Sequence, residues 1–373
     1  MPLDITLGAE HLAGFKTKLI AHPHLVQARK EVIRLIEEPA GASLAAVIGP
    51  TGAGKSTLLD GVRKVVLERR TAAMITDTSL IPIVSVEAPA PEQASFNWKD
   101  LYLRILVALK EPACEWQLAL KEKQPGKPGV TRLASLSLTE LRARVEAAFL
   151  HRGVKVLLID EAQHLRKLAG GRHAHDQMDT LKSLASLSKA FVVLFGTYEL
   201  IPMLELNGQL ARRCVMVHCP RYRHDDPAQW QSFQAAVRSL GQAIMLPTPT
   251  DLVPHSEYLY RSTAGCIGIL KGLLTTGYAR ALEEGHESLT LATLEASKLP
   301  NSALEKITEE IVVGEAHWVR SHAPNSRLDE LLGLACAING SGVVHAPIPP
   351  VARQTVGIRN PTRDPVGITA APA

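Results

Sequence analysis

The stretch SLAAVIGPTGAGKSTLLDGVRKVVLERR (43–70) decides the fold that this sequence encodes. It opens with a short apolar run, SLAAVIG (43–49), which is typical of a buried strand. KSTLLDGVRKVVLERR (55–70) then has the pattern of a helix. Between them, GPTGAGKS (49–56) matches G-x-x-x-x-G-K-[ST] at every fixed position. This order of strand, glycine-rich turn and helix predicts a loop that wraps phosphate groups. The alternative is a glycine-rich turn that matches the motif by chance, but such a turn would not need to have a strand before it and a helix after it.

Each part of this loop has a physical role in a triphosphate site. Gly49, Gly52 and Gly54 let the backbone curl with its amides pointing inward. The start of the following helix adds positive potential. Lys55 is placed to reach the β- and γ-phosphates, and the Ser56 hydroxyl to bind Mg²⁺. We therefore expect ATP to bind at Gly49, Pro50, Thr51, Gly52, Ala53, Gly54, Lys55, Ser56 and Thr57.

A second apolar run, VLLIDEAQHL (156–165), ends in two acids. Asp160 stands where a carboxylate would hold the Mg²⁺ shell together with Ser56. Glu161 follows directly and is expected to orient or deprotonate the attacking water. The alternative is that the Asp-Glu pair caps the next helix. The phosphate-binding loop upstream favours the catalytic interpretation.

Two further polar signals follow apolar runs. VVLFGT (192–197) ends in Thr197, which is expected to sense the γ-phosphate or to position the water. LARRC (210–214) brings Arg212 and Arg213 just before a candidate strand, a place that suits an arginine finger for a neighbouring subunit. The alternatives are a plain Gly-Thr turn and a solvated pair of arginines, and the sequence does not separate the two arginines.

Strands and helices alternate through the first part of the chain, which predicts an α/β fold with a parallel sheet flanked by helices. After about residue 226 the pattern is helical only, so a smaller all-α domain follows. The last residues are rich in Pro and Gly and are predicted to be mobile. The expected parts are a helical N-terminal extension (1–42), a nucleotide-binding α/β domain (43–224), a helical domain (225–334) and a tail (335–373).

The composition fits a globular protein, with 46% hydrophobic and 21% charged residues and a formal net charge of +4. No apolar run is long enough for a transmembrane helix, and MPLDITLGAEHLAGF (1–15) lacks the features of a secretory signal. The 5 cysteines form no CxxC pair, which favours reduced thiols. We therefore expect a cytoplasmic protein that does not associate with membranes.

The chain resembles the AAA+ ATPases, and within them the transposition regulators of the TnsC/TniB type. Besides the loop and the acids above, FNWKDLYLRIL (96–106), LLIDEAQHL (157–165) and FGTYELIPMLELNGQLARRC (195–214) carry this resemblance. The resemblance spans roughly residues 25–320. It implies a P-loop NTPase sheet followed by a helical lid.

The resemblance also implies a function. Members of this family bind ATP and Mg²⁺ between subunits, assemble into rings or filaments on duplex DNA, and link a target-selection protein to a transposase. Hydrolysis then disassembles the filament, and for this chain we expect hydrolysis to be slow and stimulated by DNA. In this chain the implied roles fall on Lys55, Ser56, Asp160, Glu161, Thr197 and one of Arg212 and Arg213. The chain departs from the family at the sensor-2 arginine, which is the fourth residue of a Gly-x-x-Arg pattern. In Gly265-Cys-Ile-Gly268 and Gly268-Ile-Leu-Lys271 the fourth residue is a glycine or a lysine, so Lys271 is the candidate to replace the arginine.

Contacts with DNA phosphates are predicted from charge alone. One candidate is a loop with Lys121, Lys123, Lys127 and Arg132, and another is the cluster Arg63, Lys64, Arg69 and Arg70. A solvated face is the alternative for both. Other functions that this sequence permits are a helicase loader, a secretion-associated ATPase and a P-loop kinase of a small molecule. The Asp-Glu pair and the helical C-terminal part speak against the kinase.

Overall fold

The computed structural model describes residues 5–91, 96–111, 136–166, 171–205, 212–323 and 326–333. The chain divides into two units, Met1–His322 and Ala323–Ala373. The second unit contains one described helix, α16 (Ser326–Leu331). The first unit contains all the described strands and the remaining described helices.

Five parallel strands form one sheet in the order β2-β3-β4-β1-β5. The strands are β1 (Leu44–Ile48), β2 (Ile83–Glu87), β3 (Val156–Asp160), β4 (Phe191–Gly196) and β5 (Cys214–His218). Because the strands are parallel, all their carboxyl ends meet at one edge of the sheet, where ligands bind in such folds. The predicted loop, both acids and Thr197 follow strands at this edge.

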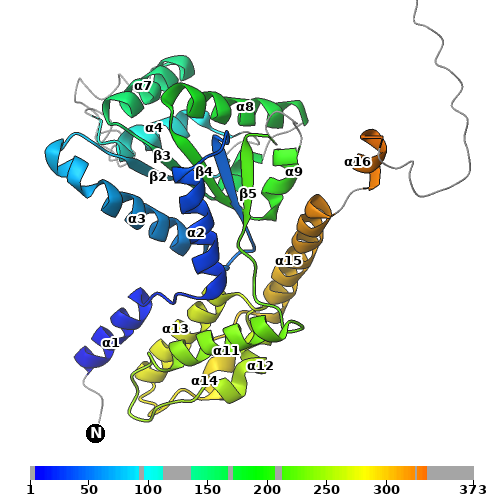
Figure 1. Ribbon diagram of the computed structural model, residues 1–373. Coiled ribbons are helices and arrows are strands. Elements are labelled where there is room, and N and C mark those ends of the chain that lie inside the picture. Colours follow the sequence, from blue (N-terminus) through cyan, green and yellow to red (C-terminus); the bar gives the residue numbers. More distant parts are fainter. Residues whose placement is uncertain are drawn as a thin grey trace, which may run out of the picture. The chain divides into compact units, whose positions relative to one another are not determined.

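Helices cover both faces of the sheet (Figure 1). On one face lie α2 (Pro23–Glu37) and α3 (Lys55–Thr76), which pack on alternate strand residues such as Ala45 and Val47. On the other face, the intervening residues such as Leu44 and Ala46 pack against α4 (Trp98–Ala108), α7 (Leu138–His151), α8 (Gly171–Ser188) and α9 (Ile201–Glu205). The alternation of side chains along each strand therefore produces two separate cores.

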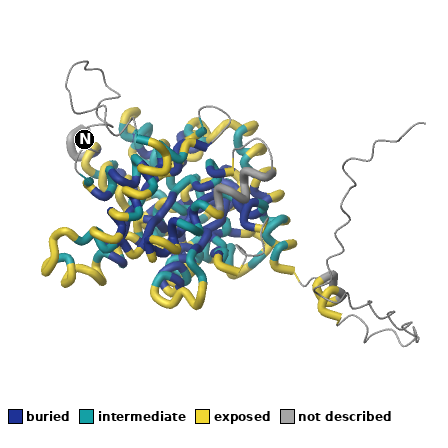
Figure 2. The backbone as a smooth tube through the Cα atoms, turned by 90° about the horizontal axis from the view of Figure 1, so that it is seen from above, coloured by how far each residue is buried: buried dark blue, intermediate teal, exposed yellow. Residues whose placement is uncertain are grey.

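A third core belongs to helices alone. It joins α11 (Pro227–Gly241), α12 (Ser256–Arg261), α13 (Ile267–Glu283) and α14 (Leu291–Glu295) around Phe233 and Leu270. The first helix of the chain, α1 (Ile5–Thr17), packs here too, with the Phe15 ring edge-on to Tyr278. In Figure 2 the buried segments lie inside and the exposed ones around them. The start of the chain thus contributes to a core formed mostly by its later helices.

The long helix α15 (Asn301–His322) runs from these helices back to the sheet. Its Gly314 lies against the ring of Tyr198, in the short 3-10 helix Tyr198–Leu200 that follows β4, and a Cβ there would lie 2.2 Å from that ring. The contact is continued by the stacked rings of His218 and Trp318. α15 therefore fixes the residues next to Thr197.

The predicted fold class is confirmed: a parallel sheet flanked by helices, in the fold of a P-loop NTPase, with later helices forming their own core. The predicted fifth strand, 213–219, is observed as Cys214–His218. The predicted domain boundaries stay a prediction. No helix among the described residues has the length and apolar character that a membrane span needs.

Candidate nucleotide-binding site

The loop between β1 and α3 has a backbone that only glycine adopts easily. Gly52 and Gly54 have φ of +78° and +96°, in the left-handed region that side chains disfavour. Gly49 is needed for a different reason, because a Cβ there would lie 2.0 Å from the carbonyl oxygen of Cys219. The predicted glycines are thus required, two by conformation and one by close packing against the end of β5.

Lys55 lies inside this loop. Its Nζ donates to the carbonyl oxygens of Gly49 at 3.0 Å and Pro50 at 2.8 Å. Burial lowers the pKa of the Lys55 ammonium, while nearby groups that include Glu161 and Asp160 act in the opposite direction. The ammonium is therefore held at the centre of the loop, next to both acids.

The two predicted magnesium ligands lie in contact. Ser56 Oγ, in the first turn of α3, donates to Asp160 Oδ2 at the end of β3, at 2.9 Å. Hydroxyl and carboxylate oxygens suit Mg²⁺, which usually takes one or two protein ligands and completes its shell with water and substrate phosphates. No cluster of three or more His, Cys, Asp or Glu suited to a metal ion occurs in the described part of the chain. The oxygen atoms of Ser56 and Asp160 fit a magnesium ion that also binds phosphates.

Glu161 is held in an unusual backbone conformation. Its φ is +51°, although it is not a glycine, and its backbone N–H donates to Asp160 Oδ1 at 2.9 Å. Left-handed residues of this kind cost free energy and occur at functional sites. The turn directs the Glu161 carboxylate toward Gln163, whose side-chain amide donates to it.

Gln163 connects Glu161 to the end of β4. While its Nε2 donates to Glu161, its Oε1 accepts the backbone N–H of Thr197 at 3.3 Å. The Thr197 hydroxyl is buried and has no hydrogen-bond partner among the described residues. A cavity of about 480 Å³ begins at Thr51 of the loop and is lined by Gln163 and Thr197. Sequence reasoning overlooked Gln163, although its place two residues after Glu161 was a usable signal.

The start of α13 closes against the loop. The backbone N–H of Gly268 donates to the carbonyl oxygen of Gly52 at 2.7 Å, and a Cβ on Gly268 would lie 2.6 Å from that oxygen. Lys271 does not take the place of the missing sensor arginine, because its Nζ donates to the carbonyl oxygens of Lys16 and Lys18 at the end of α1. The chain thus brings a backbone amide, rather than an arginine, to the loop from α13.

Two histidines just before and at the start of α2 lie near the loop. His22 Nδ1 and the Tyr222 hydroxyl are 3.0 Å apart, and the His24 ring stacks on the Tyr222 ring at a centroid distance of 4.2 Å. Burial lowers the pKa of His22 to about 4, so this ring is neutral near pH 7. A Cβ on Gly54 would lie 4.0 Å from His22 Nε2. The sequence did not indicate this aromatic cluster beside the loop.

Arg212 and Arg213 lie at the opposite edge of the sheet. Both are exposed, and the Arg213 carbonyl oxygen accepts the backbone N–H groups of Ser43 and Leu44, where β1 begins. The phosphate loop follows the other end of β1, about 17 Å away at the usual rise per strand residue. Neither arginine therefore belongs to the site of its own subunit. The predicted DNA contacts Lys121, Lys123, Lys127 and Arg132 lie outside the described residues.

The fold of this chain is shared with known proteins. Residues 38–204 match the family model described as an AAA domain. The chain has the fold of an AAA+ P-loop NTPase. The Aeropyrum pernix ORC2 protein, solved in ADPNP–ADP complexes, is similar to this chain with a TM-score of 0.50 and 15% identity, over 75% of this chain and 69% of that chain.

Two further solved structures are similar over comparable lengths. The Walker-type ATPase PABY2304 of Pyrococcus abyssi has 17% identity and a TM-score of 0.45, over 79% of this chain and 76% of that chain. Cdc6p of Pyrobaculum aerophilum has 14% identity and a TM-score of 0.49, over 76% of this chain and 69% of that chain. No curated protein matches the chain. At these identities the similarity concerns the fold alone.

Proposed function

We propose that this AAA+ protein hydrolyses ATP, assembles with ATP into rings or filaments on duplex DNA, and links target selection to a transposase. The contact between Ser56 and Asp160, next to the half-buried Lys55 in the same loop, carries the ATP-dependent part of this proposal. It unites a loop that fits phosphates with a pair of oxygens that fits their metal ion. The motifs shared with transposition regulators support the part that concerns DNA and the transposase.

The positions of the side chains support a mechanism for hydrolysis. Ser56 and Asp160 would hold a Mg²⁺ ion, which would supply positive charge to the phosphates, and Lys55 would contact the phosphate oxygens. Glu161 orients the attacking water and accepts its proton. The unpartnered Thr197 hydroxyl donates to the γ-phosphate. Gln163 holds the Glu161 carboxylate in a fixed position relative to the Thr197 backbone, because it is hydrogen-bonded to both.

The base of the nucleotide has a matching surface. Bound phosphates lie at the start of α3, and the aromatic cluster of His22, His24 and Tyr222 lies beside that start, next to Gly54. Neutral aromatic rings suit the face or edge of adenine. Of these rings only His24 is partly exposed, because His22 and Tyr222 are buried, so we place the adenine next to His24.

Oligomerisation explains the position of Arg212 and Arg213. Because they lie at the edge opposite to their own phosphate loop, an arginine from this pair can act only on the nucleotide of a neighbouring subunit. ATP between subunits would then make assembly depend on the nucleotide. The same arrangement lets hydrolysis promote disassembly.

The test is imaging of the purified chain by negative-stain electron microscopy with duplex DNA under ATP, ADP or a non-hydrolysable analogue. We expect ordered assemblies with ATP and the analogue, and far fewer with ADP. A second assay measures phosphate release. Asp160→Asn should abolish this release, whereas the control Asp179→Asn, which changes an exposed acid on α8, should leave it unchanged. Monomers under all three nucleotides would refute the oligomeric function.

A further inference from the structure

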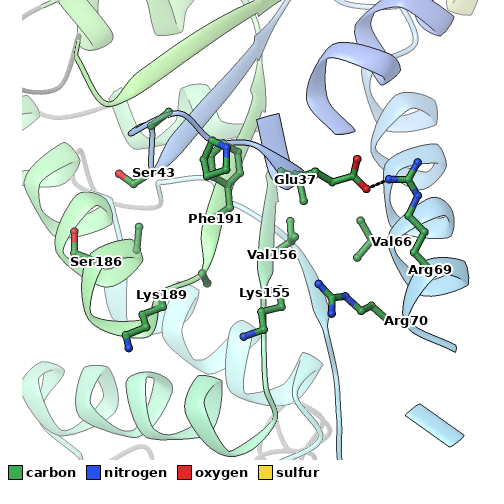
Figure 3. Close-up of a pocket in the computed structure, with 15 residues that line it drawn as sticks. Glu37, Ser43, Val66, Arg69, Arg70, Lys155, Val156, Ser186, Lys189 and Phe191 are labelled. Atoms are coloured by element: carbon green, nitrogen blue, oxygen red, sulfur yellow. Dashed lines mark ion pairs between the residues drawn. The ribbon is translucent and has the colours of Figure 1, made fainter. Parts of the chain in front are cut away.

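A second cavity, of about 660 Å³, lies at the amino edge of the sheet, at the opposite end of the strands from the phosphate loop. Its wall is apolar and includes Val66 of α3, Val156 of β3 and Phe191 of β4. Figure 3 shows these side chains between the end of α2, α3 and the residues that precede β3 and β4. Nothing in the hydrolysis of ATP requires a cavity at this edge.

The rim of this cavity is strongly basic. Arg69, Arg70, Lys155 and Lys189 line it, and all are exposed. Arg69 forms an ion pair with Glu37, which is drawn in Figure 3. No acid among the described residues pairs with the other three cations. We call Arg70, Lys155 and Lys189 the basic rim.

The basic rim groups cations that have no acidic partner among the described residues. The whole chain carries a formal net charge of only +4, and the rim supplies three unpaired cations within one cavity. A partner with several negative charges would interact favourably with all three exposed cations at once. The Ser43 hydroxyl, which also lines the cavity, is buried and has no hydrogen-bond partner among the described residues.

The chemistry of the rim suits a phosphodiester backbone better than a single small anion. Its cations come from a helix and from the starts of two strands, so they spread along the sheet edge instead of converging on one point. Lys155 and Lys189 precede neighbouring strands, which are about 4.8 Å apart, and Arg70 lies beside them on α3, so the three cations span more than one strand spacing. Duplex DNA has about one charge per 1.7 Å of axis, which places several phosphates opposite such a stretch. The exposed amines and guanidinium can reach those oxygens without reading bases.

We propose that the basic rim at the amino edge of the sheet binds the phosphate backbone of duplex DNA without sequence preference. This proposal rests on the proposed function, because it supposes that the chain binds DNA. It separates the described basic cluster into two parts. Arg63, Lys64 and Arg69 are each paired with an acid, whereas Arg70 joins the rim with the two lysines.

The test uses the full chain with Mg²⁺, a non-hydrolysable ATP analogue and a fluorescent 30-base-pair duplex of mixed sequence. The rim variant combines Arg70→Gln, Lys155→Gln and Lys189→Gln. The matched control combines Arg34→Gln, Arg223→Gln and Arg261→Gln, which remove the same charge at exposed arginines that are paired with acids elsewhere. Affinity is measured by fluorescence anisotropy at several salt concentrations. Binding of a fluorescent ATP analogue checks that each variant retains its nucleotide site.

For the rim variant we expect a loss of affinity on the order of 10²-fold near 0.1 M salt. The slope of log affinity against log salt should become shallower by about 2.7, since three phosphate contacts disappear. The control should change affinity less than about threefold, and both variants should bind the ATP analogue like the unmodified chain. If the rim variant and the control bind DNA equally well, the inference is wrong and the proposed DNA binding stands. If the unmodified chain binds no duplex even at low salt, both fail.

Discussion

Replacement of Gln163 by leucine tests the proposed catalytic importance of the hydrogen bonds that connect Glu161 to the end of β4. The variant loses the hydrogen bond to the Glu161 carboxylate and the one to the Thr197 backbone N–H. A bond to a charged group contributes about 1.5–3 kcal/mol and a neutral one about 0.5–1.5 kcal/mol. If both act in the transition state, the barrier rises by about 2–4 kcal/mol, and kcat falls about 30- to 1000-fold.

The assay is steady-state phosphate release over a range of ATP concentrations. KM should change less than about threefold, because the phosphates are held by the Lys55 loop and not by Gln163. Glu199→Gln is the control, since Glu199 lines the same cavity, is exposed, and pairs only with Arg166 among the described residues. It should leave kcat within about twofold. A Gln163→Leu chain that folds, binds ATP and keeps kcat within twofold would refute this reasoning.

Three further predictions follow. Gly268→Ala should lower stability by about 1–3 kcal/mol, because its new methyl group would press on a backbone oxygen of the phosphate loop; thermal denaturation measures this, and Gly272→Ala, where a Cβ meets nothing within 4 Å, should not destabilise. A chain in which Arg212 and Arg213 are both replaced by alanine should be inactive in phosphate release, and so should a chain with Lys55→Ala. If the arginines act between subunits, a mixture of the two chains should regain part of the activity. A mixture that stays inactive would count against this role of the arginines. His22 has a pKa lowered to about 4 against 6.5 in the unfolded chain, so the stability it contributes is present above pH 6.5 and is lost as the pH falls toward 4, by up to about 3 kcal/mol. Denaturant unfolding gives the free energy of unfolding at pH 7 and at pH 5. The difference between these two values should be smaller for His22→Gln than for the unmodified chain, and an equal difference would contradict this assignment.

Much of the nucleotide site was predictable because its residues follow strands directly. A parallel sheet aligns all its strand ends, so Ser56 and Asp160 come into contact although they are far apart in the sequence. Gln163 was missed because its role depends on how the chain turns after Glu161, where a left-handed residue redirects the side chains. The aromatic cluster of His22 and Tyr222 was missed because it joins segments 200 residues apart.

The sequence by itself determined the phosphate loop, the acids after β3 and the class of the fold. These are local patterns, in which spacing and residue type are sufficient, since backbone conformation and strand polarity place the groups. Only the tertiary structure decided that α1 packs with the later helices and that Lys271 is engaged by the end of α1. Only it showed the basic rim, because the order of strands in the sheet brings together residues that precede β3 and β4 with the end of α3. Contacts between distant segments depend on packing, and no local pattern encodes them.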